Sequence, residues 1–145
     1  MKSLSQVLLK AGASVAARSR NGETPLHLAT LHEDPFLVEL LLRAGADPKA
    51  RNLDGESTLF WAALTGHNAV VQRLIGEGAE VNVTDVKGNL PLHAAADGGY
   101  ADVVETLLPL TAEPAAKNRA GLSARGLARE RRHVEVERLL ERFGE

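Results

Sequence analysis

Five histidines are the side chains in this sequence best suited to chemistry near neutral pH, since an imidazole can exchange a proton or bind a metal. They are His27, His32, His67, His93 and His133. His32 is followed by Glu33 and Asp34, but adjacent residues on a helix point in different directions. No pair of histidines combines metal-ligand spacing with supporting partners, and the chain has no cysteine. The histidines are therefore too scattered to indicate a catalytic or metal site.

Other signatures of catalysis are also missing from the sequence. Gly76-Glu77-Gly78 has the glycines of a helix stop, but it lacks the preceding strand and the further glycine of a phosphate-binding loop. There is no G-x-S-x-G motif and no cysteine nucleophile. A direct enzyme would need residues as far apart as His32 and Asp97 to converge. We therefore predict a protein that is not an enzyme, with no catalytic residue, no metal and no cofactor.

Composition favours one soluble domain with a protein partner. Apolar residues make up 44% of the 145, enough for one core. The net charge of -2 argues against a nucleic-acid binder, and no basic amphipathic or long apolar segment points to a membrane. We expect a cytoplasmic monomer. A secretory signal over residues 1–16 is the alternative, but Lys10 interrupts its apolar run and the repeat pattern described below accounts for the same residues.

The segment from Asn21 to Asp47 predicts two short helices. Thr24 is a good N-cap, and Pro25 suits the first helical position because its missing N–H would be unpaired there. Polar residues and Pro35 end this helix, a second begins near Phe36, and the glycine at position 45 ends it. Each helix has about eight residues, fewer than the roughly 12 to 15 that are stable alone in water. Both must therefore pack against neighbouring units.

Those neighbours recur every 33 residues. Glycines, alanines and leucines repeat at this interval: Gly22, Gly55, Gly88 and Gly121; Gly12, Gly45 and Gly78; Ala29, Ala62, Ala95 and Ala128; Leu8, Leu41, Leu74, Leu107 and Leu140. A fixed period of paired short helices indicates a stacked solenoid.

The repeated unit resembles the ankyrin repeat family. The resemblance is carried by GETPLHLA at 22–29, GNLPLHAA at 88–95, VVQRLI at 70–75 and GAEVN at 78–82. It implies an all-α solenoid of helix-turn-helix units with short hairpin-like loops, and non-enzymatic binding of a protein as adaptor, scaffold or inhibitor. The alternative is a targeting or regulatory domain of a larger protein whose activity lies elsewhere. The resemblance also implies that His27 and His93 hydrogen-bond the backbone.

The period divides residues 1–145 of this single domain into an N-terminal half-repeat cap at 1–19, repeats at 20–52, 53–85 and 86–118, and a C-terminal cap at 119–145. Thr58 replaces the helix-starting proline in the second repeat, and Pro109 predicts an early end to the last helix of the third. Seven arginines against five glutamates give the C-terminal cap a charge of +2. They form either a solvated face or a basic docking patch.

In ankyrin-like stacks the loop tips and first helices line a concave groove, so the resemblance assigns partner binding to residues in those rows. They are Arg18, Arg20, Glu23, Leu31, His32, Arg51, Leu53, Asp54, Glu56, Phe60, Leu64, Val86, Lys87 and Asn89. We expect Leu31, Leu53, Leu64 and Val86 to form an apolar centre inside a charged rim. The alternative is that Leu53 and Val86 only pack on each other between adjacent loops.

Two aromatic residues depart from the repeat pattern. Trp61 aligns with Leu28, which we expect to point inward, so Trp61 is assigned to the core rather than the groove. Phe60 takes the place of the repeated histidine. It either braces neighbouring repeats or reaches the groove.

Overall fold

The computed structural model describes residues 15–32 and 34–143. Within these ranges the regular structure is helical, apart from one β-bridge between Arg51 and Ser57, which confirms the all-α class. The half-repeat predicted over 1–19 and the secretory alternative rest mainly on residues 1–14. Those residues lie outside the described part, as does Glu33.

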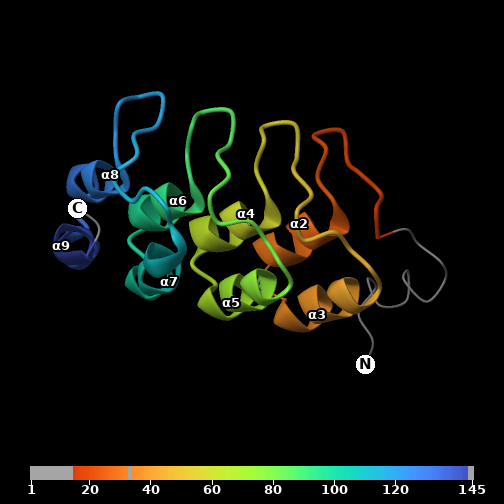
Figure 1. The fold of residues 1–145 in the computed structure, drawn as a ribbon. Helices are drawn as coiled ribbons and strands as arrows, with labels where there is room; N and C mark the ends of the chain where they lie inside the picture. The colour runs from red at the N-terminus through yellow and green to blue at the C-terminus, as the bar shows by residue number, and fades with distance from the viewer. Residues whose placement is uncertain (1–14, 33, 144–145) are drawn as a thin grey trace.

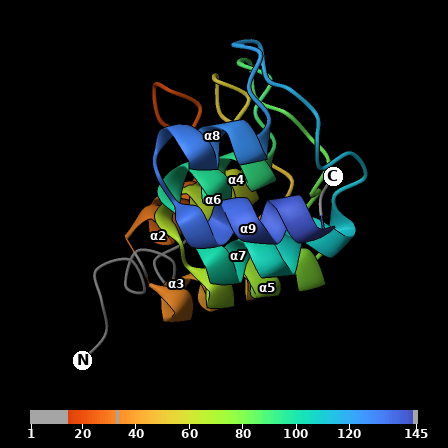
Figure 2. The ribbon, with the colours of Figure 1, turned by 90° about the vertical axis from the view of Figure 1, so that its left-hand side faces the viewer.

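The described helices follow one another in pairs along the chain. They are α2 (Pro25–Leu31), α3 (Pro35–Arg43), α4 (Thr58–Thr65), α5 (Asn68–Gly76), α6 (Pro91–Gly98), α7 (Ala101–Leu107), the 3₁₀-helix η1 (Leu108–Leu110), α8 (Ala124–Glu130) and α9 (Val134–Phe143). Each first helix packs on the next first helix, and each second helix on the next second helix. Figure 1 shows the two resulting rows, with α2, α4, α6 and α8 beneath the hairpins and α3, α5, α7 and α9 farther away. Figure 2 shows the same two layers from the end of the stack formed by α8 and α9.

The first helix pair begins and ends much as the sequence predicts. The Thr24 hydroxyl accepts the His27 N–H at 3.3 Å and caps α2, which has Pro25 in its first turn. The Asp34 carboxylate accepts the Leu37 N–H at 3.0 Å and caps α3, so this helix begins at Pro35, one residue before the predicted start. Gly45 follows α3 with φ of 95°, the left-handed conformation expected at a helix end.

The later repeats differ from the first in how their helices begin and end, and each difference has a local structural cause. Ser57 caps α4, and the Thr58 hydroxyl that replaces the proline donates to the Pro48 carbonyl at 3.2 Å. In the third repeat α7 ends at Leu107 and continues as the 3₁₀-helix that contains Pro109, which confirms the early end. The Thr111 hydroxyl then donates to the Leu107 carbonyl at 2.8 Å, so a side chain pairs one of the carbonyls at this helix end.

The core runs along the stack between the two rows of helices. It is built from repeated small and aliphatic side chains that are at most 2% exposed: Leu26, Leu59 and Leu92; Ala29, Ala62, Ala95 and Ala128; Leu41, Leu74, Leu107 and Leu140. The alanines allow the short first helices to approach one another closely, and the leucines of the second helices fill the space below. Burial between neighbours stabilises helices that are too short to persist alone.

Backbone hydrogen bonds join each hairpin to the next at one repeated position. The bonds run from Leu53 N to Asn21 O at 2.9 Å, from Val86 N to Asp54 O at 3.0 Å and from Arg119 N to Lys87 O at 3.0 Å. We call this series the hairpin ladder. It fixes the hairpins side by side, as the row of loops in Figure 1 shows.

A glycine directly follows each acceptor residue of the ladder because two requirements meet there. Gly22, Gly55 and Gly88 have φ between 74° and 79°, and a Cβ on any of them would lie 3.0 to 3.2 Å from a ladder nitrogen of the next hairpin. Gly121 has φ of 81°, but a Cβ there would meet nothing within 4 Å. Position 121 therefore requires glycine only for its left-handed backbone conformation, whereas positions 22, 55 and 88 also require it because the next hairpin leaves no room for a Cβ.

The substitution Gly55→Ala should lower the free energy of unfolding by more than Gly121→Ala. Both variants force a residue with a Cβ into the left-handed region, at a cost of roughly 1 to 2 kcal/mol. Only Gly55→Ala also places a methyl group 3.2 Å from the Val86 nitrogen. Urea denaturation followed by circular dichroism gives both losses. Equal losses would show that the close approach of the hairpins adds nothing to the requirement for glycine.

Candidate functional site

A cavity of about 230 Å³ lies between the hairpins and the first helices, on the side of the stack that the resemblance assigns to the concave face. The hairpins contribute Asn89 and Asn118, whose side chains are joined by a 2.8 Å hydrogen bond. The helices α4, α6 and α8 contribute Phe60, Leu64, His93, Ala94, Asp97 and Leu127, and Arg131, the C-cap residue of α8, completes the lining. The structure thus brings hairpin and first-helix residues together in one hollow, as a groove for a partner requires.

Three leucines leave apolar surface on the first helices. Leu31 on α2 and Leu64 on α4 occupy equivalent repeat positions and are 45% and 42% exposed. Leu28, one turn before Leu31, is 41% exposed, so the expectation that it points inward is wrong. Trp61 at the equivalent position is only 9% exposed, which confirms its place in the core. The indole is covered because it packs edge-on against His27 and donates to Glu56 at 3.1 Å, contacts that a leucine does not make.

The hairpin tips carry the other two apolar candidates. Leu53 is 73% exposed and Val86 is 49% exposed. Both donate backbone bonds of the hairpin ladder, so their main chains are fixed while their side chains remain accessible. This exposure favours the predicted apolar centre over the alternative in which the two side chains bury each other.

Two arginines of the predicted rim also hold the hairpins together. Arg18 donates to the Gly22 carbonyl at 3.0 Å and to the Arg51 carbonyl of the next hairpin at 2.8 Å. Arg51 in turn donates to the Gly55 carbonyl at 3.1 Å and to the Thr84 carbonyl one repeat on. Their charges remain at the surface, because backbone carbonyls accept hydrogen bonds without neutralising a guanidinium. A change at Arg51 therefore disturbs the fold as well as the rim.

The remaining candidates divide by exposure. Arg20, His32, Asp54 and Lys87 are exposed, whereas Glu23, Glu56 and Asn89 are half-buried. The Glu56 carboxylate accepts hydrogen bonds from the Asn52 and Trp61 side chains, so it stabilises the fold. Phe60 is only 6% exposed. This burial favours the first alternative, in which the ring braces neighbouring repeats, although Phe60 also lines the cavity.

His27 and His93 link each first helix to the following hairpin. Nδ1 of His27 accepts the Thr24 N–H at 3.2 Å, and Nε2 donates to the Glu56 carbonyl at 2.9 Å. His93 repeats this pattern with the Leu90 N–H at 3.0 Å and the Leu122 carbonyl at 3.2 Å. Because a carbonyl only accepts, both rings carry their proton on Nε2 and are neutral. Burial lowers the pKa of both imidazoles, although the hydrogen bond to the carbonyl raises it in part.

The concave face becomes charged toward the C-terminal cap. Asp97 stands at the position of Leu31 and Leu64, and its carboxylate pairs with Arg131 at 2.9 Å. Two further ion pairs join α8 to α9, between Arg129 and Glu137 at 2.9 Å and between Arg125 and Glu141 at 3.6 Å. These contacts lie mostly at the surface and favour the solvated face over a basic docking patch.

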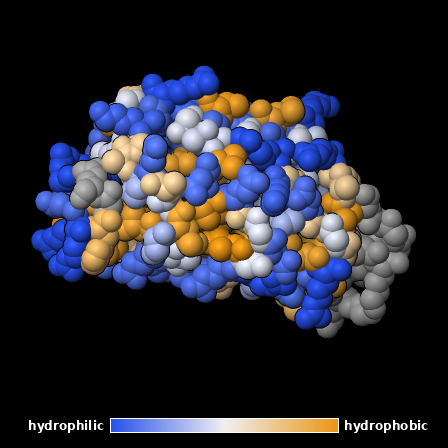
Figure 3. Space-filling view, in the orientation of Figure 1, coloured by the Kyte–Doolittle hydropathy of each residue, from blue (hydrophilic) through white to orange (hydrophobic). Residues whose placement is uncertain are grey.

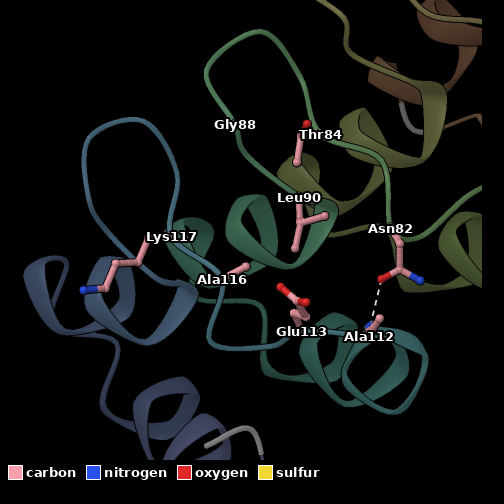
Figure 4. Close-up of a pocket in the computed structure, with 8 residues that line it drawn as sticks. All are labelled: Asn82, Thr84, Gly88, Leu90, Ala112, Glu113, Ala116 and Lys117. Carbon is pink, nitrogen blue, oxygen red and sulfur yellow. Dashed lines mark hydrogen bonds between the residues drawn. The ribbon is translucent and has the colours of Figure 1, made fainter.

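A second cavity, of about 260 Å³, opens on the opposite side of the hairpins (Figure 4). In Figure 4 the Asn82 side chain lies across from the loop at Ala112, whose N–H donates to it at 2.8 Å, while Glu113 points toward the middle. The Asn82 amide also donates to the Leu110 carbonyl at 3.1 Å. Asn82 therefore holds this loop in place with two hydrogen bonds.

Sequence reasoning missed several residues that shape this surface. Ser19, Asn52, Asp85 and Asn118 recur every 33 residues, and each accepts backbone N–H groups two and four residues later, which closes its hairpin turn. Their short polar side chains at turn positions were a usable signal. The Asp97 to Arg131 pair had no comparable signal, because 34 residues separate the partners.

Within residues 15–32 and 34–143, no group of three or more histidine, aspartate or glutamate side chains is placed to hold a metal ion. Over the same ranges, no helix has both the length and the apolar character needed to cross a membrane.

Comparisons with known proteins agree with the repeat geometry. Residues 31–118 match the family described as ankyrin repeats (3 copies), and residues 2–42 match the family described as ankyrin repeats (many copies). No curated protein matches the chain.

The protein should become less stable as the pH falls below about 6.5, the ordinary pKa of histidine. The pKa of His27 and His93 is lowered in the folded state, so between that lowered pKa and 6.5 the unfolded chain binds protons that the folded chain does not. Urea denaturation at pH 7.5 and 5.5 measures the loss. His93→Gln should reduce it, whereas His32→Gln, at an exposed residue, should not. An unchanged loss in His93→Gln would contradict the neutral buried ring.

Proposed function

The chain belongs to the ankyrin repeat family, and we propose that it is a non-enzymatic recognition module that binds a partner protein across its concave face. Ankyrin repeats generally mediate protein–protein interaction, and more than half of the chain matches the family. The binding face is formed by the hairpin tips and the first helices. An adaptor, a scaffold or a stoichiometric inhibitor would all use such a face, because each needs binding without turnover.

The observation that carries this proposal is the alignment of exposed apolar side chains. Leu28, Leu31 and Leu64 lie on α2 and α4, and Leu53 and Val86 lie at the tips of the hairpins that follow these helices. Contiguous exposed apolar surface edged by polar groups commonly marks an interaction site. In this chain it occurs where the 33-residue copies differ from one another, whereas the buried positions repeat almost unchanged.

The residues around this surface have the makeup of an interface rim. Arg20, Asp54 and Lys87 are exposed at successive hairpin tips. Interfaces concentrate their binding energy in central apolar anchors, and the polar rim contributes mainly to specificity and association rate. The leucines are therefore expected to control affinity and the tip charges to control the choice of partner.

The variants Leu64→Ser and Lys87→Glu should weaken binding to a partner captured from native extract and then purified. Neither residue makes a side-chain hydrogen bond or ion pair within the described structure, so the melting temperature should change little. Loss of an apolar anchor typically costs more than 1 kcal/mol, or about fivefold to tenfold in affinity. Titration calorimetry and thermal unfolding measure the two effects.

Two matched variants serve as controls for this experiment. Leu110→Ser removes a leucine of similar exposure, 47%, from η1, which does not line the cavity between the hairpins and the first helices, and Arg138→Glu reverses a charge on α9. Both should bind like the unmodified protein. If the controls weaken binding as much as Leu64→Ser and Lys87→Glu do, the concave face is not the binding site.

A further inference from the structure

We propose that the segment bound by the concave face is an acidic amphipathic helix. The inference rests on the proposed function, because it uses the same face, and it adds the conformation and charge of the ligand. Two features carry it. One is the leucine floor, formed by Leu28, Leu31 and Leu64, and the other is the set of exposed cations along the hairpins.

The spacing of the leucine floor suits a helical ligand. Leu31 and Leu64 occupy equivalent positions on α2 and α4, which pack directly on each other. Packed helix axes lie about 8 to 10 Å apart. Residues seven apart on a helix share one face and are separated by about 10.5 Å along its axis. A helix that crosses α2 and α4 can therefore place residues i and i+7 on the two leucines, with i+3 or i+4 between them.

An extended ligand fits the same spacing less well. Side chains on one face of a strand are separated by about 6.6 Å or 13 Å, since only every second residue points the same way. Neither distance matches the interval between stacked first helices. The floor also ends after two repeats, because Asp97 takes the third equivalent position and is paired with Arg131. The apolar stripe of the ligand is thus expected to extend over two to three helical turns.

The charge of the hairpins selects an acidic ligand. Six cationic side chains are exposed on the four hairpins, and we call them the hairpin rim: Arg18, Arg20, Arg51, Lys87, Lys117 and Arg119. The chain as a whole has a net charge of -2, so this concentration of positive charge is local. Figure 3 shows the upper edge of the molecule, where apolar patches lie between strongly hydrophilic ones along the hairpins.

The carboxylates on the same hairpins are fewer than the cations, and most of them accept hydrogen bonds from within the protein. Glu23 accepts a bond from the Ser19 hydroxyl at 3.0 Å, Glu56 from Trp61 at 3.1 Å, and Asp85 from two backbone N–H groups at 2.9 Å. All three are half-buried, and Asp54 is the one exposed carboxylate within the hairpin residues 17–23, 50–56, 83–89 and 116–122. Six cations against the four carboxylates Glu23, Asp54, Glu56 and Asp85 leave the hairpins with a net charge of +2, so a ligand meets a net positive edge beside an apolar floor. Glutamates along one flank of an amphipathic helix would complement both.

The inference can be tested with a synthetic peptide of about 18 residues, long enough to span roughly 27 Å as a helix. Leucines on one face and glutamates along one flank define the acidic peptide, and a second peptide has lysine in place of each glutamate. Fluorescence anisotropy with the intact protein should show tighter binding of the acidic peptide, by about tenfold or more at low salt, with a preference that shrinks as salt is added.

Variants of the protein test whether the leucine floor and the hairpin rim each contribute to binding of the peptide. Leu31→Ser combined with Leu64→Ser should lower the affinity for the acidic peptide about tenfold or more, since two apolar anchors are lost. Lys87→Glu combined with Arg119→Glu should lower it as well and flatten its salt dependence. Arg138→Glu on α9 is the matched control and should leave both properties unchanged.

Four results would overturn the inference. Equal binding of the lysine peptide would show that the rim does not select charge, and full binding of an acidic peptide with a central proline would show that a helix is not required. If the protein binds single-stranded RNA, and the double variant with Leu31→Ser and Leu64→Ser binds it equally well, the hairpin rim is a nucleic-acid site rather than a site for an acidic helix. If a captured partner instead binds through these leucines by an extended or basic segment, the proposed function stands and only the helix inference fails.

Discussion

The stability of the protein depends on contact between repeats, because no described helix is longer than ten residues and isolated helices of this length are marginal in water. Each helix pair leaves an apolar face that only the next pair can cover. The buried leucines and alanines at 33-residue intervals supply this cover, and the hairpin ladder adds directional bonds. Stability is therefore a sum of local interfaces rather than the property of one central core.

The sequence predicted the fold well because that fold is specified by short-range signals repeated at a fixed interval. Thr24, Pro25 and Gly45 mark helix boundaries within a few residues of the features they control. Burial is harder to predict, since it depends on neighbours. Leu28 and Trp61 hold the same repeat position, yet one is exposed and the other covered by His27 and Glu56.

The candidate site was predictable in outline but not in the role of each residue. The repeat rows identified Leu31 and Leu64 because exposed positions on short first helices follow from periodicity. The double role of Arg51 was not visible, since its acceptor is a carbonyl one repeat away and depends on how the hairpins stack. The same holds for Asp97, whose partner is Arg131. Side-chain contacts between repeats can be identified only from the three-dimensional structure, whereas the repeats themselves can be identified from the sequence.

The hairpin ladder has an implication for how such a chain can change length. Each bond joins residues that are 32 apart, Leu53 to Asn21, Val86 to Asp54 and Arg119 to Lys87. Duplication or loss of a whole unit preserves every donor and acceptor in register, so the concave face can gain or lose one segment while the remaining segments keep their geometry. A single residue inserted in a hairpin would instead misalign its donor, its acceptor and the glycine beside them. Variation in the length of the recognition surface is thereby restricted to whole repeats.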